Sequence, residues 1–295
     1  MKRLALGLAL AVTSLHGRAQ ACSCSGQGPA SALTRPDQTY GVRLSQRLLL
    51  GRGAFNAHGS YAPFAAGEHD RTLEYVLLAA YRWQRLELAG TFGYGARMAV
   101  ISDESARTTG ASDTTLRARY EAVTDPEPWQ HELYPAFAML ATLRLPTAQA
   151  TGIAPRGLGA TEFALGGVLE RSVVPTFRLS VLGEIAGRLQ DTTLGITRRL
   201  GPRASAELTA SYFLDPAWVL SVLASVRWEG NASLRGRSQS GTAQRTTEVG
   251  AALSWQPWSS PFRAGLSERY APPIDGLAAN TVQSVTSELW LGYVR

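Results

Sequence analysis

The sequence is poor in the residue types that usually perform catalysis or hold metals. Its 295 residues include only two cysteines and four histidines, and neither a GxSxG nor an HExxH motif occurs. His58 and His69 share one predicted loop, whereas His131 falls at the opposite end of the predicted fold. Because no nucleophile is placed beside a base, we predict that the chain is not an enzyme and needs no cofactor.

Long apolar runs and a strong net charge are also missing. After the first residues, no run approaches the roughly 18 apolar residues that a membrane-spanning helix needs. The formal net charge is +6, and Lys2, Arg3 and Arg18 account for three of these charges, which leaves +3 on the rest of the chain. A charge this small gives no reason to expect a nucleic-acid partner.

The first 21 residues have the pattern of a secretory signal peptide. Two basic residues precede the apolar run LALGLALAV, and Ala19-Gln20-Ala21 forms a small-x-small cleavage motif. We expect residues 1–21 to be cleaved on export, 22–37 to form a periplasmic segment, and 38–295 to form one membrane domain. Cys22 and Cys24 begin the periplasmic segment; lipidation of Cys22, free thiols and a metal-binding pair are all open alternatives there.

The chain is rich in alternation of period two. In VPTFRLSVLGEIAGRLQ (174–190), one set of alternate residues is apolar or glycine, whereas the other set carries Arg178, Glu184 and Arg188. This pattern predicts a strand that lies between two different environments. Twelve segments show it: 39–51, 71–82, 85–98, 113–123, 132–146, 160–171, 176–189, 203–213, 217–229, 244–255, 261–270 and 282–295.

The connections between these segments alternate in length. Those after the odd-numbered segments are long and rich in Gly, Ser, Thr, Asp and Pro, and those after the even-numbered segments are mostly short. Long extracellular loops and short periplasmic turns are typical of outer-membrane barrels. We therefore predict an all-β fold, a single transmembrane antiparallel β-barrel of about 12 strands, with 10–14 possible. A soluble β-sandwich would have shorter strands at closer spacing.

Tryptophan residues cluster at the short-turn end of the predicted barrel. Aromatic rings prefer the interface between lipid and water, so these residues predict an aromatic girdle on the periplasmic side. The girdle candidates are Trp83, Trp129, Trp218, Trp255 and Trp258. Trp290 does not fit, because its register points it inward.

The charged alternate positions face the interior of the predicted barrel. Arginines outnumber glutamates on this face, which predicts a weak preference for anions. Ion pairs across strands that merely stabilise the wall are the alternative interpretation. The residues predicted to line or constrict the lumen are Arg117, Arg119, Arg178, Glu184, Arg203, Glu207, Arg227 and Glu248.

Three segments carry a resemblance to a known family. They are SDTTLRARYEAV (112–123), YPAFAMLATLRLPTA (134–148) and GIAPRGLGATEFALGG (152–167). This order resembles the transporter-type outer-membrane proteins of the "meta-pathway of phenol degradation" family, in which a GxGDxxLxARY-like strand precedes an LPTG strand end. Ser112 and Ala148 stand where that family has glycine. The resemblance implies a barrel of about twelve strands and passage of small, often hydrophobic, solutes.

The sequence thus predicts a bacterial outer-membrane channel or transporter for small solutes, possible substrates being hydrophobic or aromatic compounds. Its expected partners are the outer-membrane lipid bilayer, the small-molecule solute and the outer-membrane barrel assembly machinery. The alternative is a closed structural or docking barrel whose loops bind partners. A barrel enzyme that acts on lipid is a third, weaker hypothesis.

Overall fold

The computed structural model describes residues 33–34, 38–101, 104–123, 135–148, 159–174, 176–193, 196–215, 217–257 and 260–295. The predicted signal peptide, Cys22, Cys24, Trp129 and Trp258 lie outside these residues. The described residues contain no helix, and so none long and apolar enough to cross a membrane.

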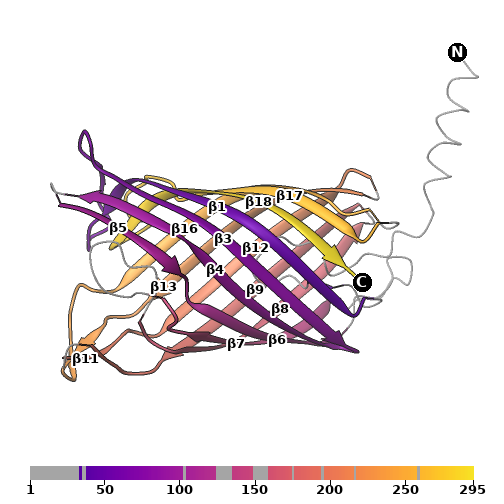
Figure 1. The fold of residues 1–295 in the computed structure, drawn as a ribbon, viewed down its shortest axis with the longest axis horizontal. Coiled ribbons are helices and arrows are strands. Elements are labelled where there is room, and N and C mark those ends of the chain that lie inside the picture. The colour runs from indigo at the N-terminus through magenta and orange to yellow at the C-terminus, as the bar shows by residue number, and fades with distance from the viewer. Residues whose placement is uncertain are drawn as a thin grey trace, which may run out of the picture.

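Twelve long strands form one closed antiparallel sheet (Figure 1). In chain order they are β1 (Tyr40–Phe55), β3 (His69–Trp83), β4 (Leu86–Ile101), β6 (Thr114–Val123), β7 (Ala136–Leu145), β8 (Glu162–Val174), β9 (Phe177–Arg188), β12 (Arg203–Phe213), β13 (Trp218–Glu229), β16 (Gln244–Trp255), β17 (Phe262–Tyr270) and β18 (Thr281–Val294). Each pairs with its predecessor, and β18 pairs with β1 from Gly41↔Val294 to Phe55↔Thr281. The predicted fold class and strand number are therefore confirmed.

Six short strands lie in the long connections, and the alternation did not predict them. They are β2 (Tyr61–Pro63), β5 (Glu104–Ala111), β10 (Asp191–Thr193), β11 (Ile196–Arg199), β14 (Ser233–Leu234) and β15 (Arg237–Ser238). β5 extends the β4 ribbon, and β10, β11, β14 and β15 form a separate small sheet. All six lie at the end of the barrel with the long connections, here called the loop end; the other is the turn end.

The two faces of the wall differ as the alternation requires. On β9, Val181 and Ile185 are 48% and 68% exposed, whereas Arg178 and Arg188 are 2% and 4% exposed. The outer surface is covered with exposed leucine, valine and aromatic side chains on every long strand except β7, where Met139 takes this place. A continuous apolar surface of this kind suits contact with lipid, because its exposure to water would be unfavourable.

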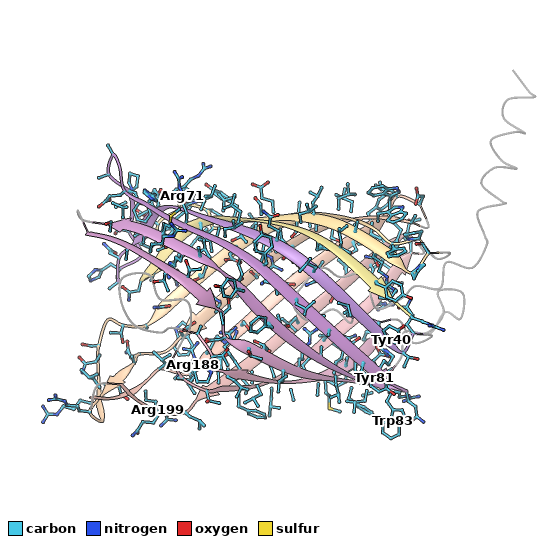
Figure 2. The ribbon with its side chains drawn as sticks, viewed as in Figure 1. Tyr40, Arg71, Tyr81, Trp83, Arg188 and Arg199 are labelled. Carbon is cyan, nitrogen blue, oxygen red and sulfur yellow. The ribbon has the colours of Figure 1, made fainter. Side chains whose placement is uncertain are left out.

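Aromatic side chains gather at the turn end. Trp83 is 64% exposed there, and Figure 2 shows it beside Tyr81 at the same end as Tyr40. Trp218 pairs in register with Trp255 across β13 and β16. These three tryptophans lie at the turn end, and the membrane girdle predicted from them stays a prediction.

Trp290 is turned into the barrel, as its register requires. It is only 6% exposed, and the Arg43 guanidinium lies 5.7 Å from its ring centroid. The ring lies against Gly265 of the next strand, where an added Cβ would come within 2.6 Å of it. Glycine on β17 therefore makes room for an indole inside the lumen.

Candidate functional site

The lumen contains a cavity of about 1000 Å³ in its loop-end half. Most of the residues that line it are polar, with hydroxyl groups such as Thr72, Thr91 and Thr115 between charged side chains, and Leu49, Phe55 and Val76 add apolar surface. Four arginines and four carboxylates contribute to it: Arg47, Arg97, Arg144, Arg227, Asp70, Glu74, Asp113 and Glu248. Because the two sets are equal, the cavity itself has no formal charge excess, and the predicted preference for anions stays a prediction.

Ion pairs between neighbouring strands fix several of these side chains. Arg97 donates from Nε and Nη2 to the two carboxylate oxygens of Asp70, at 2.9 and 2.6 Å. Arg47 Nε donates to Glu288 Oε2 at 3.1 Å. Bidentate and charge-assisted contacts of this kind restrict the positions of the Arg97 and Arg47 guanidinium groups.

A second ion-pair cluster lies at the loop end, on β8, β9, β12 and β13. Arg188 is 2.7 Å from Glu162 and 2.7 Å from Glu229. Arg203 is 2.9 Å from Glu162 and 2.5 Å from Glu184. This chain of alternating charges links four adjacent strands and is part of the wall.

The turn-end half of the lumen is closed. Inward-facing charged side chains there are almost completely covered: Arg82, Glu87, Arg119, Glu121, Glu170 and Arg178 are each at most 5% exposed. An apolar cluster of Leu140 and Val168, with Leu182 packed against it, also projects into the lumen. Side chains that lined an open, water-filled bore would be more exposed, so the described residues of this half are packed closely against one another.

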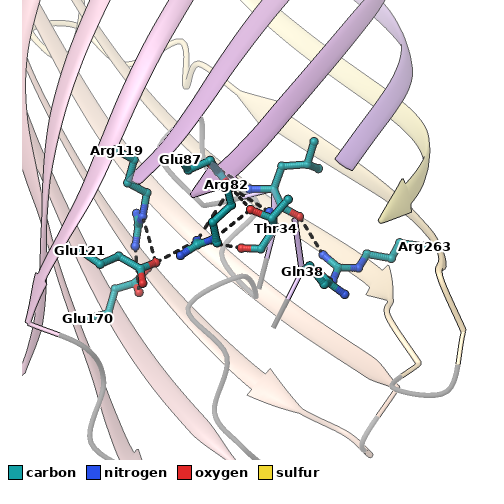
Figure 3. A network of polar contacts seen from close by, with 9 residues as sticks. Thr34, Gln38, Arg82, Glu87, Arg119, Glu121, Glu170 and Arg263 are labelled. Carbon is teal, nitrogen blue, oxygen red and sulfur yellow. Dashed lines mark hydrogen bonds and ion pairs between the residues drawn. The ribbon is translucent and has the colours of Figure 1, made fainter. Parts of the chain in front are cut away.

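The chain's own N-terminal segment contributes to this closure (Figure 3). Thr34 is fully buried, and its N–H and hydroxyl donate to Glu87 Oε2 at 2.9 and 2.5 Å. Arg82 donates to the Thr34 hydroxyl and carbonyl oxygens at 3.0 and 2.9 Å. The Leu33 N–H donates to Glu87 Oε1 at 3.2 Å. A segment that we expected to lie in the periplasm thus has two residues bound inside the barrel.

The part of the wall on the other side of β1 also holds these residues. Arg263 on β17 donates to the Leu33 carbonyl at 3.0 Å and to Gln38 Oε1 at 2.7 Å. Arg82 on β3 is itself 3.0 Å from Glu121, and Arg119 is 3.6 Å from Glu170. The contacts therefore run from β8 across β6, β3 and the N-terminal segment to β17.

The predicted lumen residues do not form a single ring. Arg227 and Glu248 line the cavity, whereas Arg119 and Arg178 belong to the closed half. Arg203 and Glu184 pair in the loop-end cluster, and Glu207 pairs with Arg269 at 3.1 Å. Arg117 lies on β6 between the two halves, two residues from the cavity-lining Thr115. The eight candidates are thus spread along the full length of the lumen.

Asp70, Asp113, Leu33 and Thr34 belong to the site but were not among the residues that the sequence predicted. Asp70 was assigned to a loop, but β3 begins one residue earlier, and Asp70 is buried against Arg97. Its position two residues before the inward Thr72 was the available signal. Leu33 and Thr34 precede the first alternating segment, and no pattern in the sequence marked them.

We also looked for groups of side chains among the described residues that could bind a metal ion. Within the described ranges, no group of three His, Cys, Asp or Glu side chains could hold a metal ion. Cys22 and Cys24 lie outside those ranges.

No family model matches the chain, and no curated protein matches it. Solved structures do match. The COG4313 outer membrane channel from Pseudomonas putida F1 is 14% identical with a TM-score of 0.76, over 92% of this chain and 100% of that one. The NanC porin is 9% identical with a TM-score of 0.50, over 86% and 98% of the two chains. At these identities the likeness concerns the fold alone: this chain has the fold of outer-membrane β-barrels.

Proposed function

We propose that the chain is a bacterial outer-membrane channel through which small solutes pass passively. One observation carries the proposal: a closed barrel with an apolar outer surface encloses a polar cavity of about 1000 Å³. Binding pockets for small molecules have volumes of roughly 300–1,000 Å³, so the cavity has room for a molecule of that size. The solved channel and porin of the same fold support the same assignment.

The lining favours polar solutes. Guanidinium, carboxylate and hydroxyl groups surround the cavity, and a hydrophobic solute there would displace water from them without replacing its hydrogen bonds. The sequence motifs resembling the "meta-pathway of phenol degradation" family point instead to hydrophobic solutes. We give the cavity chemistry more weight, because the lining residues would contact the solute directly.

Liposome swelling tests the proposal, because the swelling adds up all the solute that enters through the protein during the measurement. Liposomes containing the refolded full chain should swell in small uncharged sugars, and more slowly as the sugar becomes larger. Folding is verified beforehand by the altered gel mobility of unheated barrel. Swelling no faster than that of protein-free liposomes, with verified barrel present, would rule out the channel.

A second function, a closed structural or docking barrel, is favoured by the burial of the turn-end half. Glu87 and Arg119 are 1% and 2% exposed in the lumen, which is the packing that a closed barrel would have. In that case the long connections 52–70 and 230–243 would bind partners. The swelling experiment separates the two functions, since a docking barrel passes no solute of any size.

A further inference from the structure

The outer surface of the wall has a hollow on β8, β9, β12 and β13. Small residues stand at four outward positions of β9 and β12: Gly183, Gly187, Ala204 and Ala206. No atom lies within 4 Å of a Cβ added at Gly183 or Gly187. Two adjoining spaces of about 480 and 400 Å³ result, and larger side chains border them: Phe163, Leu165, Ile185, Val226 and Trp228. These nine residues are here called the outer hollow.

The outer hollow is apolar and lies toward the loop end. Trp228 and Phe163 are next to the loop-end termini of their strands and are 48% and 53% exposed. All nine residues are apolar or glycine, because the charged side chains of these strands point into the lumen. The long loops of outer-membrane barrels are extracellular, so the outer hollow would face the acyl chains of the outer leaflet.

The two connections next to the outer hollow are basic. Residues 189–202 and 230–243 contain four arginines and one acidic residue: Arg198, Arg199, Arg235, Arg237 and Asp191. They form the small sheet of β10, β11, β14 and β15, here called the basic lobe. Figure 2 shows Arg199 in this lobe, beyond Arg188 at the loop end.

The basic lobe is joined to the edge of the outer hollow. The Gly230 N–H donates to the Pro202 carbonyl at 2.8 Å, which links the bases of the two connections. Pro202 itself lines the smaller of the two spaces, together with Trp228. The positive charge of the lobe therefore lies next to the loop-end edge of the apolar hollow.

The arginines of the lobe do not share a single face. Ser233 lies opposite both Arg199 and Ser238, so Arg237, the neighbour of Ser238, points to the other face of the sheet. Arg235 lies in the turn between β14 and β15. All three arginines are exposed. The lobe thus presents a guanidinium group to the membrane surface whichever face is turned toward it.

An apolar hollow beside a basic lobe matches one class of ligand. Guanidinium groups bind phosphate oxygens in bidentate fashion, and an apolar hollow in a lipid-facing wall fits an acyl chain. A lipid that carries phosphate combines the two chemistries. A second copy of the chain fits less well, because a two-fold contact through this face would bring two basic lobes together.

We propose that the outer hollow and the basic lobe form one binding site for a phosphate-bearing lipid of the outer leaflet. An acyl chain of the lipid lies in the hollow, and arginines of the lobe bind its phosphate. The site lies on the outer surface and is separate from the lumen, so this inference does not depend on the passage of solute.

Native mass spectrometry of the refolded full chain in detergent tests the site. The probes are bis-phosphorylated lipid A and the same lipid with its phosphates removed, so that the acyl chains are identical. We expect the barrel to retain one molecule of the phosphorylated lipid, with an apparent Kd roughly tenfold or more below that of the dephosphorylated form. Equal retention of the two lipids would overturn the proposal.

A triple substitution tests the basic lobe. Arg199→Gln/Arg235→Gln/Arg237→Gln should raise the Kd of the phosphorylated lipid roughly tenfold or more and leave that of the dephosphorylated lipid unchanged. The matched control removes three exposed loop-end arginines on the other side of the barrel, by Arg52→Gln/Arg71→Gln/Arg107→Gln. Equal changes in the two triple variants would contradict a phosphate site at the lobe.

A larger side chain tests the outer hollow. Gly183→Leu fills the space and should weaken the binding of both lipids roughly tenfold, because an acyl chain loses its contacts. Gly187→Leu is a second filling variant that serves if the first folds poorly. The control is the outward Gly90→Leu on β4, where an added Cβ meets only Leu116, at 3.7 Å.

The mass spectra also distinguish a lipid from a second chain in the outer hollow. All variants are compared after the altered gel mobility of unheated barrel has verified folding. Retention of lipid that neither filling variant weakens would refute the site. Paired chains that the filling variants separate, with lipid retention unchanged, would assign the hollow to a second copy and would also overturn the proposal.

Discussion

At the scale of single residues, the most consequential lumen contacts are those in which one guanidinium bridges two carboxylates. Arg188 does this for Glu162 and Glu229, at 2.7 Å each, and is only 4% exposed. Arg227 also lies near Glu229, but its closest approach is 4.0 Å and its side chain is 49% exposed. The two ion pairs therefore share the Glu229 carboxylate but differ in burial.

Replacement of Arg188 by methionine should destabilise the barrel strongly. Removing one partner of a buried ion pair leaves uncompensated charge, which lowers the free energy of unfolding by roughly 3 kcal/mol. Urea unfolding in the presence of lipid vesicles, followed by tryptophan fluorescence, measures this. Arg227→Met is the control, with an expected loss below about 1 kcal/mol because the pair is solvated. Similar losses for both variants would contradict the importance of burial.

Individual inward residues could be predicted, but their partners could not. Parity along each strand placed Arg188 and Glu162 on the lumen face, whereas their pairing depends on the register Glu162↔Arg188 between β8 and β9. That register is set by the geometry of a connection, which alternation does not encode. The contacts of Thr34 lay further out of reach, because Glu87 is 53 residues away in the chain.

At the scale of elements, alternation located the strands well wherever it was unbroken. β12 (Arg203–Phe213) and β16 (Gln244–Trp255) have the predicted bounds. β1 continues to Phe55, four residues beyond its prediction, because a register shift between Gly51 and Gly53 changes the parity. Two- to four-residue strands such as β11 are too short to show a period.

The pairing of β17 with β18 depends on a glycine opposite a tryptophan. Because a Cβ at Gly265 would lie 2.6 Å from the Trp290 ring, Gly265→Val should overpack the lumen and lower the free energy of unfolding by roughly 1–3 kcal/mol. The same unfolding assay applies. Gly183→Ala on β9 is the control, since no atom lies within 4 Å of its added Cβ. A Gly265 variant as stable as the control would mean that Trp290 moves away without loss.

At the scale of the whole molecule, two features of the lumen carry the proposed function: a cavity at the loop end and a densely packed turn end. The sequence predicted the barrel, its two faces and its charged lumen, because these follow from a period of two. It did not predict the contacts of Leu33 and Thr34 inside the barrel, because these residues precede the strands and bind mainly through their main chain. The balance of charges around the cavity also required the structure, since Asp70 and Asp113 joined its lining only there.

The most direct test of passage through the lumen is the modification of a cavity cysteine during single-channel recording. Thr115 lines the cavity, whereas the adjacent Leu116 is 47% exposed on the outer face. With Cys22 and Cys24 replaced by serine, a bulky charged thiol reagent should reduce the current through Thr115→Cys in steps and leave Leu116→Cys unchanged. Current that is absent although folded barrel is verified in the bilayer, or that the reagent leaves unaltered in Thr115→Cys, would contradict a solute path through this cavity.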